Sequence, residues 1–235
     1  MTQTLSEQKE LVYVVAKSLG DLNDQVVFVG GCATGLVIND SSVVSVRPTK
    51  DVDVIVEVIG RAEYYRLEKK LRSLGFTNDP AGPICRWQIE SIIVDFMPDD
   101  ESILGFSNRW YESAIQTAQA HELEDMIIRV VTPALFLATK LEAFRGRGEG
   151  DFLSSHDIED FLAVIDGRPG IVRDCFDAPN EVKQYLHQEI EKLLENQEFM
   201  NALPGYAVTQ STSPASTGVL LDRLQSITKA LGRST

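Results

Sequence analysis

The sequence reads FVGGCATGL at residues 28–36 and RPTKDVDVIVEV at residues 47–58, and these two stretches decide the fold. The first joins a β-branched run at 25–29 to a helical pattern through Gly30 and Gly31, which predicts a strand, a tight turn and a helix. The second predicts a strand over 51–58. Two glycines between a strand and a helix let backbone N–H groups approach an anion, although such a pair is more often only a tight turn.

Two carboxylates mark the leading end of the second strand. Asp51 and Asp53 are spaced i, i+2, so both side chains project from one face of the strand. Like charges this close repel one another unless a cation lies between them. A hard divalent cation that prefers oxygen ligands, Mg²⁺ above all, is the expected partner.

A third acid, Asp95, interrupts the apolar run SIIVDFM at residues 91–97. An unpaired carboxylate in a buried strand is costly, so Asp95 is expected to face a cleft or a metal ion. Together the three acids can position a metal-bound triphosphate, with Asp95 accepting a proton from an attacking hydroxyl. Taken singly, Asp51 can be a solvated turn residue and Asp95 can pair with Arg86, but the combination favours a site.

The first half of the chain reads as mixed α and β. Thr4 and Glu7 have the spacing of a capping box, which predicts a helix that ends before Gly20. Further elements predicted in this half are a charged helix over 60–76 that stops at Gly75, two strands or one bent strand over 85–98, and one strand over 122–131.

The second half reads as helices only. Thr132 and Pro133 supply an N-cap and a first-turn proline for a helix over 134–148. Three further helices are predicted over 156–167, capped by Ser155, over 181–200, capped by Asn180, and over 219–232. The expected fold is therefore α/β of the α+β type, with a small mixed-sheet core over 1–130 and a helical domain over 131–235.

Composition excludes several classes of function. The chain has 235 residues, of which 22 are basic and 35 acidic, giving a net charge of −13 that disfavours coating DNA or binding an anionic membrane. A local basic groove remains compatible with this charge. Three scattered cysteines without a CxxC pair indicate neither a disulfide scaffold nor a zinc cluster, and favour a reducing, cytoplasmic setting. Because the N-terminal segment carries charges inside its apolar pattern and no run reaches about 18 apolar residues, we expect neither secretion nor a membrane span.

With Gly30 and Gly31, RPTKDVDV at 47–54 and IIVDF at 92–96, the chain resembles the nucleotidyltransferase superfamily that includes DNA polymerase β. The signature of that superfamily is a Gly-Gly or Gly-Ser turn, a DxD pair and a later Asp on a neighbouring strand. Residues 140–168, KLEAFRGRGEGDFLSSHDIEDFLAVIDGR, are similar to the Lys, Arg and Asp motifs of AbiEii/AbiGii-type nucleotidyltransferases. These are the enzymatic halves of certain bacterial toxin–antitoxin and phage-defence systems. The resemblance spans roughly residues 26–168.

The resemblance implies a set of site residues: Gly30 and Gly31 for the triphosphate, Asp51, Asp53 and Asp95 for catalysis and Mg²⁺, and Lys140 with Asp157 for the nucleotide. Cys32 departs from the family pattern, because many relatives carry a small hydroxyl residue after the glycines. One hydroxyl fewer is then available to a phosphate oxygen.

Lys140 can be interpreted independently of the resemblance. Its helix is rich in apolar residues, so the side chain is expected either to snorkel to the helix edge or to reach nucleotide phosphates. Arg145 and Arg147 extend the same helix end. Together with Arg47, these cations are predicted to form a local positive patch that binds an anionic substrate.

Asp157 and Asp160 lie one helical turn apart near a predicted helix start. Acids there interact favourably with the helix dipole, and this is our interpretation of Asp160. The role of Asp157 stays open between this and the site that the resemblance implies.

The predicted reaction is in-line attack of an acceptor hydroxyl on the α-phosphorus of an NTP, with two metal ions and release of pyrophosphate, in a cleft closed by the helical domain. By resemblance the acceptor is the 3′ end of a tRNA or another RNA, and the partner a cognate antitoxin protein. Small alcohols, aminoglycoside-like compounds and protein hydroxyls fit the site equally well. The alternative is a catalytically weak regulatory or interaction protein on the same fold. Neither a membrane nor DNA is an expected partner.

Overall fold

A computed structural model describes residues 3–40, 42–43, 45–58, 60–147, 150–210 and 216–232. The chain forms two compact units, one of Met1–Leu36 with Pro48–Thr132 and one of Val37–Arg47 with Pro133–Thr235. The first unit mixes strands and helices, and the second is mainly helical, which confirms the predicted fold class. The segment Val37–Arg47 falls with the helices although it lies in the first half of the sequence.

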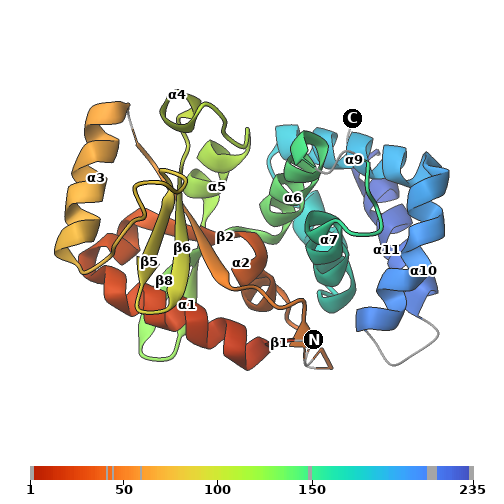
Figure 1. Ribbon diagram of the computed structural model, residues 1–235. Coiled ribbons are helices and arrows are strands. Elements are labelled where there is room, and N and C mark those ends of the chain that lie inside the picture. The colour runs from red at the N-terminus through yellow and green to blue at the C-terminus, as the bar shows by residue number, and fades with distance from the viewer. Residues whose placement is uncertain are drawn as a thin grey trace. The chain divides into compact units, whose positions relative to one another are not determined.

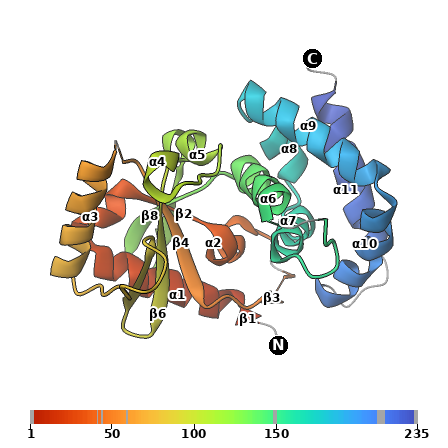
Figure 2. The ribbon, with the colours of Figure 1, turned by 45° about the horizontal axis from the view of Figure 1, so that its top comes forward.

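A six-stranded sheet forms the centre of the α/β unit, in the order β5-β6-β4-β2-β8-β7. The strands are β2 (Val26–Val29), β4 (Asp51–Val56), β5 (Arg86–Ile89), β6 (Ile92–Pro98), β7 (Gln119–Leu123) and β8 (Met126–Val130). The sheet is mixed: β4 pairs with β6 and β2 with β8 in parallel, and the other neighbours are antiparallel. Figure 2 shows β6, β4, β2 and β8 side by side. All four residues of β2 are buried, as a central strand of branched side chains requires.

The helices of this unit follow from local signals (Figure 1). Their bounds are α1 (Leu5–Leu19), the 3-10 helix η1 (Gly20–Gln25), α2 (Gly30–Val37), α3 (Arg61–Ser73), α4 (Glu101–Leu104) and α5 (Tyr111–Thr117), and a short β1 (Gln3–Thr4) precedes them. The predicted capping box is confirmed: Glu7 N donates to Thr4 Oγ1 at 3.1 Å, and Thr4 N donates to the Glu7 carboxylate at 2.7 Å. The apolar face of α1 is buried and packs against β4 and β6.

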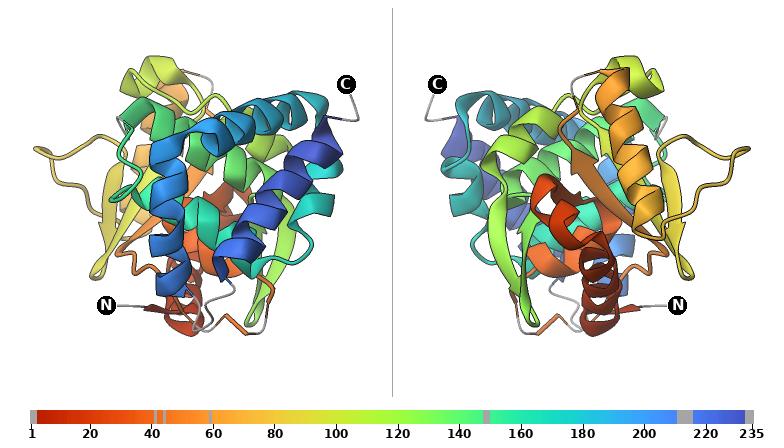
Figure 3. Two further views of the ribbon diagram at one scale, coloured as in Figure 1. Left: turned by 90° about the vertical axis from the view of Figure 1, so that its right-hand side faces the viewer. Right: turned by 90° about the vertical axis from the view of Figure 1, so that its left-hand side faces the viewer.

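The helical unit consists of β3 (Ser45–Val46), α6 (Pro133–Arg147), α7 (His156–Gly167), α8 (Ile171–Phe176), α9 (Asn180–Glu195), α10 (Gln197–Gln210) and α11 (Ser216–Leu231). Pro133 opens α6 and Ser155 Oγ caps α7, both as predicted. α6 and α7 pack against each other, and α11 contacts α7, α8, α9 and α10 (Figure 3). Within the described residues, no helix combines the length and the apolar character needed to cross a membrane.

Three sequence predictions were wrong in detail. The single strand expected over 122–131 is a hairpin of β7 and β8 that turns at Glu124, whose φ is 53°. The helix expected over 181–200 is two helices, because the Asn196 side chain accepts from Glu198 N and Phe199 N and so begins α10. Asn180 does not cap α9: it is the first helical residue, and Pro179 holds the cap position without a side-chain hydrogen bond.

The segment Val37–Arg47 is anchored to the end of α7. Asn39 N and Asp40 N donate to the Gly167 carbonyl at 3.2 and 3.0 Å, and Arg168 Nη1 donates to the Val37 carbonyl at 2.8 Å. A Cβ on Gly167 would lie 2.9 Å from Ile38 side-chain carbons, so the close approach requires glycine there. These contacts hold the segment beside α7, where Arg47 binds Asp160.

Candidate active site

Strand register brings the three acids together. Asp51 and Asp53 alternate with buried valines on β4, so their side chains share a face of the sheet. The parallel pairing of β4 with β6 places Asp53 directly opposite Asp95. All three carboxylates therefore lie on the same face, on two neighbouring strands.

The glycine turn lies against the central acid. β2 pairs with β4 so that Val29 is opposite Asp53, and Gly30 follows at once with a φ of +69°. A Cβ at Gly30 would lie 1.9 Å from Asp53 Oδ2, a distance that no real side chain tolerates. Both the backbone conformation and the missing side chain are thus needed for the Asp53 carboxylate to occupy its position.

Two buried side chains hold the turn and the helix α2 that it opens. Gln8 of α1 donates from Nε2 to the Gly31 carbonyl at 3.4 Å and accepts from Gly35 N at 3.0 Å. Cys32, 1 % exposed, donates its thiol to the Val29 carbonyl at 3.1 Å. Its side chain therefore bonds back to the end of β2, as a small hydroxyl residue could also do.

Each outer acid has its own polar partner. Thr49 Oγ1 donates to Asp51 Oδ1 at 2.6 Å, and the Asp51 side chain is 40 % exposed. Arg86 of β5 lies opposite Asp95 in the antiparallel register and donates to both of its carboxylate oxygens, at 2.9 and 2.6 Å. Arg86 Nη2 also lies 3.9 Å from Asp51 Oδ2. Hydrogen bonds to Asp95, and then the charges of Asp95 and Asp51, raise the pKa of Arg86 further above its usual value.

Two neighbouring titratable groups stay neutral beside this cluster. Burial, and then the negative charge of Asp95, raise the pKa of the Cys85 thiol. Burial likewise raises the pKa of Tyr64, whose hydroxyl donates to the Ile84 carbonyl at 3.4 Å. Both groups are therefore protonated at neutral pH, and carboxylates and one guanidinium carry the charge of the site.

The carboxylates of Asp51 and Asp53 are suitable ligands for one Mg²⁺ ion. Asp51 and Asp53 supply carboxylate oxygens from one face, and Mg²⁺ in proteins is commonly held by one or two carboxylates with phosphate oxygens and water completing the octahedron. Within the described residues, no three His, Cys, Asp or Glu side chains converge closely enough to hold one ion together. The predicted ligand role of Asp95 remains a prediction, since Arg86 contacts both of its oxygens.

The helical unit contains a separate ionic network that involves the other predicted site residues. Lys140 of α6 is buried, and its Nζ lies 2.6 Å from Asp160 Oδ2 and 3.3 Å from Asp157 Oδ1. Arg47 binds both Asp160 oxygens at 3.1 and 3.0 Å, and Arg147 binds both Asp157 oxygens at 2.9 Å. Burial alone would raise the pKa of Asp160, but the charges and hydrogen bonds of Lys140 and Arg47 outweigh it and hold that pKa below its usual value.

This network corrects two interpretations of the sequence. Asp160 is not a dipole-facing residue at a helix start, because it is 2 % exposed and binds two cations. The predicted positive patch is neutralised by carboxylates: Arg47, Lys140 and Arg147 by the two aspartates, and the half-exposed Arg145 by Glu142 and Glu189 at 3.6 and 3.7 Å. Lys140 neither snorkels to solvent nor presents an uncompensated charge. The proposed contacts of Arg47, Lys140, Arg145 and Asp157 with a nucleotide remain predictions.

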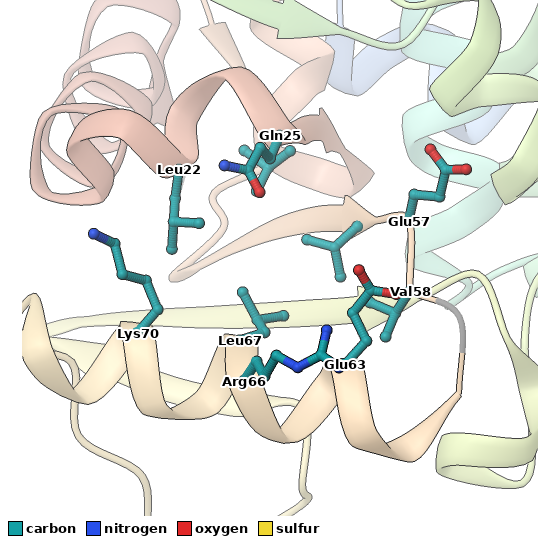
Figure 4. A pocket seen from close by; sticks show the side chains of 10 residues that line it. Leu22, Gln25, Glu57, Val58, Glu63, Arg66, Leu67 and Lys70 are labelled. Atoms are coloured by element: carbon teal, nitrogen blue, oxygen red, sulfur yellow. The ribbon is translucent and has the colours of Figure 1, made fainter.

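A pocket of about 300 Å³ lies in the α/β unit at the end of β4 remote from the acids. Figure 4 shows Leu22 and Leu67 facing each other across it, with Lys70 at one end and Glu57 and Glu63 at the other. None of the predicted site residues lines this pocket, so it is distinct from the acid cluster.

Three residues that contact the acids or the glycine turn were not among the predicted site residues, although the alternative pairing of Asp95 with Arg86 is confirmed. Thr49 could have been found, because a hydroxyl two residues before a carboxylate often bonds locally. Arg86 was weighed only as the structural alternative for Asp95, and its contact with the cluster depends on the β5–β6 register. Gln8 had no sequence signal beyond being a polar residue on the apolar side of a helix.

The fold is similar to that of two solved structures. An antigenic nucleotidyltransferase-like protein from Paracoccidioides brasiliensis is 19 % identical, covers 86 % of this chain and 95 % of its own, and has a TM-score of 0.51. JHP933 from Helicobacter pylori is 12 % identical, covers 98 % of this chain and 94 % of its own, and has a TM-score of 0.50. Neither a protein-family model nor a curated protein matches the sequence. At these identities the likeness shows that the chain shares the fold of these two structures.

Proposed function

We propose that the α/β unit is an Mg²⁺-dependent nucleotidyltransferase that moves an NMP group from an NTP to an acceptor hydroxyl. One observation carries the proposal: Asp53 lies opposite Asp95 through the β4–β6 pairing and against Gly30 of the glycine turn through the β2–β4 pairing. A backbone that a phosphate can approach, at Gly30, therefore lies next to a pair of carboxylates that can bind a divalent cation. The nucleotidyltransferase-like fold supports the same conclusion.

In this proposal Asp51 and Asp53 hold Mg²⁺, which when bound neutralises phosphate charge and polarises the α-phosphorus. The Gly30–Gly31 backbone at the N-terminus of α2 receives the triphosphate, helped by the helix dipole. Thr49 fixes the orientation of Asp51, and Gln8 fixes the turn. These contacts preorganise the site before the substrate arrives.

The chemical step is a substitution at phosphorus. The acceptor oxygen forms a bond to the α-phosphorus while the bond from that phosphorus to the bridging oxygen breaks, so pyrophosphate leaves with the bonding electron pair. Asp95 accepts the hydroxyl proton, because a carboxylate oxygen retains a lone pair beside the hydrogen bond from Arg86.

The acceptor and the biological setting extend this proposal. Similarity of residues 140–168 to AbiEii/AbiGii-type motifs supports a toxin-like or phage-defence enzyme acting in the cytoplasm, with a tRNA 3′ end or other RNA as acceptor and a cognate antitoxin as partner. The three cysteines are buried and form no disulfide, which is compatible with a reducing compartment. The alternative, a catalytically weak regulatory protein, gains support from the contact of Arg86 with Asp95.

The test is incubation with each NTP radiolabelled at the α-phosphate, Mg²⁺ and one of three acceptor pools: total RNA, protein or small alcohols. We expect one pool to become labelled by the wild type and not by Asp53→Asn. Label in the RNA pool supports the toxin-like setting, and label in another pool refutes it but retains the enzyme. Absence of label from every pool would favour the weak regulatory protein.

A further inference from the structure

The acid cluster already contains a fixed cation. Arg86 contacts both oxygens of Asp95 at 2.9 and 2.6 Å and lies 3.9 Å from Asp51 Oδ2. A guanidinium cannot lose its proton in a protein, and its planar fork matches a carboxylate. The third acid is therefore neutralised whether or not a metal ion is present.

The pairing of β5 with β6 places Arg86 next to Asp95. Arg86 and Asp95 are cross-strand partners in the β5–β6 register, so their side chains rise from the same face at adjacent positions. The Phe96 amide donates to the Cys85 carbonyl at 2.8 Å, which fixes the two strands next to the pair. The Asp95 side chain is only 11 % exposed, so separating it from Arg86 would leave a largely buried carboxylate without that partner.

The side-chain charges of the cluster favour one metal ion. Three carboxylates and one guanidinium leave two net negative charges, which one divalent cation balances. A second divalent cation at Asp95 would lie beside the Arg86 guanidinium, and like charges at that distance repel. Its binding would require Arg86 to leave Asp95.

We propose that Arg86 takes the place of a second metal ion, so that the site holds one divalent cation, on Asp51 and Asp53. This inference rests on the proposed function and replaces the expectation of two metal ions. Arg86 is a positioning residue here: it holds Asp95 in place as a proton acceptor and keeps it from binding metal.

The test counts metal ions. Equilibrium dialysis against Mn²⁺ and a non-hydrolysable NTP analogue gives the excess of each on the protein side, and hence the number of Mn²⁺ ions per bound nucleotide. We expect one ion for the wild type and two for Arg86→Met, because the freed Asp95 becomes a ligand. Arg86→Met combined with Asp95→Asn should return to one, and Arg61→Met, an exposed arginine of α3, should stay at one.

Two ions per nucleotide in the wild type would overturn the inference, and this result does not depend on whether any variant folds. A folded Arg86→Met protein that still binds one ion would also overturn it. In both cases the proposed function would stand. Retention of neither Mn²⁺ nor nucleotide by the wild type would instead refute the proposed function, and the inference with it.

Discussion

The Asp53 carboxylate occupies the space in which a side chain of Gly30 would lie: a Cβ there would be 1.9 Å from Asp53 Oδ2. The contact joins the turn after β2 to the acidic end of β4, and it exists because Val29 and Asp53 are paired across the two strands. The glycine that sets the turn and the aspartate that we propose as a cation ligand are thus positioned by a single contact.

Gly30→Ala should therefore displace Asp53 rather than merely strain the turn. Because a displacement of about 1 Å at a reacting group can cost about 100-fold in rate, we expect nucleotidyl transfer to fall at least that far. Steady-state kcat/KM for the NTP measures this.

Gly105→Ala is the matched control for backbone strain. Gly105 has a φ of +80°, and a Cβ there would meet nothing within 4 Å. We expect this variant to lose about 1 kcal/mol of stability and to retain full activity. If both alanine variants are equally active, the contact of Gly30 with Asp53 has no functional role.

Asp95→Asn should lower the rate of nucleotidyl transfer much more than it lowers the stability of the fold. An amide cannot accept the hydroxyl proton, so transfer should fall by about 10²–10⁴-fold, the usual contribution of a general base. Stability should fall by about 1.5–3 kcal/mol, the contribution of a hydrogen bond between charged groups. Activity assays and urea unfolding measure the two effects.

Asp100→Asn is the control for that substitution. Asp100 caps α4 by accepting from Ser102 N, and asparagine caps helices equally well, so both activity and stability should be unchanged. An Asp95→Asn protein with wild-type turnover would rule out proton transfer to Asp95.

Lys140→Met should lower the free energy of unfolding. Removing one partner from a buried ion pair costs about 3–5 kcal/mol, and we expect the lower end because Arg47 and Arg147 still bind the two aspartates. Arg145→Met removes a cation from the same helix that is 51 % exposed, and should cost less than about 1 kcal/mol. Urea unfolding of the two variants tests the difference; equal stabilities would show that the buried network contributes nothing.

The same network predicts a pH dependence. The folded pKa of Asp160 lies below its ordinary value of 3.8, so its contribution to stability is complete above pH 3.8 and is lost as pH falls through the folded pKa. Burial raises the pKa values of Glu159 and Asp166, so these two groups make the folded state more stable as pH falls. Unfolding midpoints measured against pH for the wild type and Lys140→Met test this, because the loss of stability at acid pH should be smaller in the variant. Parallel curves would contradict it.

Local signals made much of the fold predictable. Thr4 and Glu7 are three residues apart, and Pro133 acts at its own position, so each could be read without knowing the rest of the chain. The β7–β8 hairpin was missed because its turn uses Glu124 at positive φ, where neither Gly nor Asn marks it. The break between α9 and α10 was missed because Asn196 lies within a continuous amphipathic pattern.

The site was predictable only as far as residue types could show it. The acids and glycines indicate a site by their residue types alone. Which cations neutralise the acids, however, depends on contacts between residues that are distant in sequence. Arg47 lies 113 positions from Asp160 in sequence, and Lys140 lies 20 positions from it, so their pairing follows from the packing of the helical unit. The function of a lysine surrounded by apolar residues could not be decided without those partners.

The most direct test of the central claim measures which phosphate of the NTP is transferred and whether the transfer requires Asp53. Parallel reactions use one NTP labelled at the α-phosphate or at the γ-phosphate, with Mg²⁺ and the acceptor pool that the first assay identifies. The account predicts that the acceptor gains α-label and no γ-label, that pyrophosphate appears in equal amount, and that Asp53→Asn abolishes both products while remaining folded. Transfer of γ-label, or α-label transfer by Asp53→Asn at the wild-type rate, would contradict it.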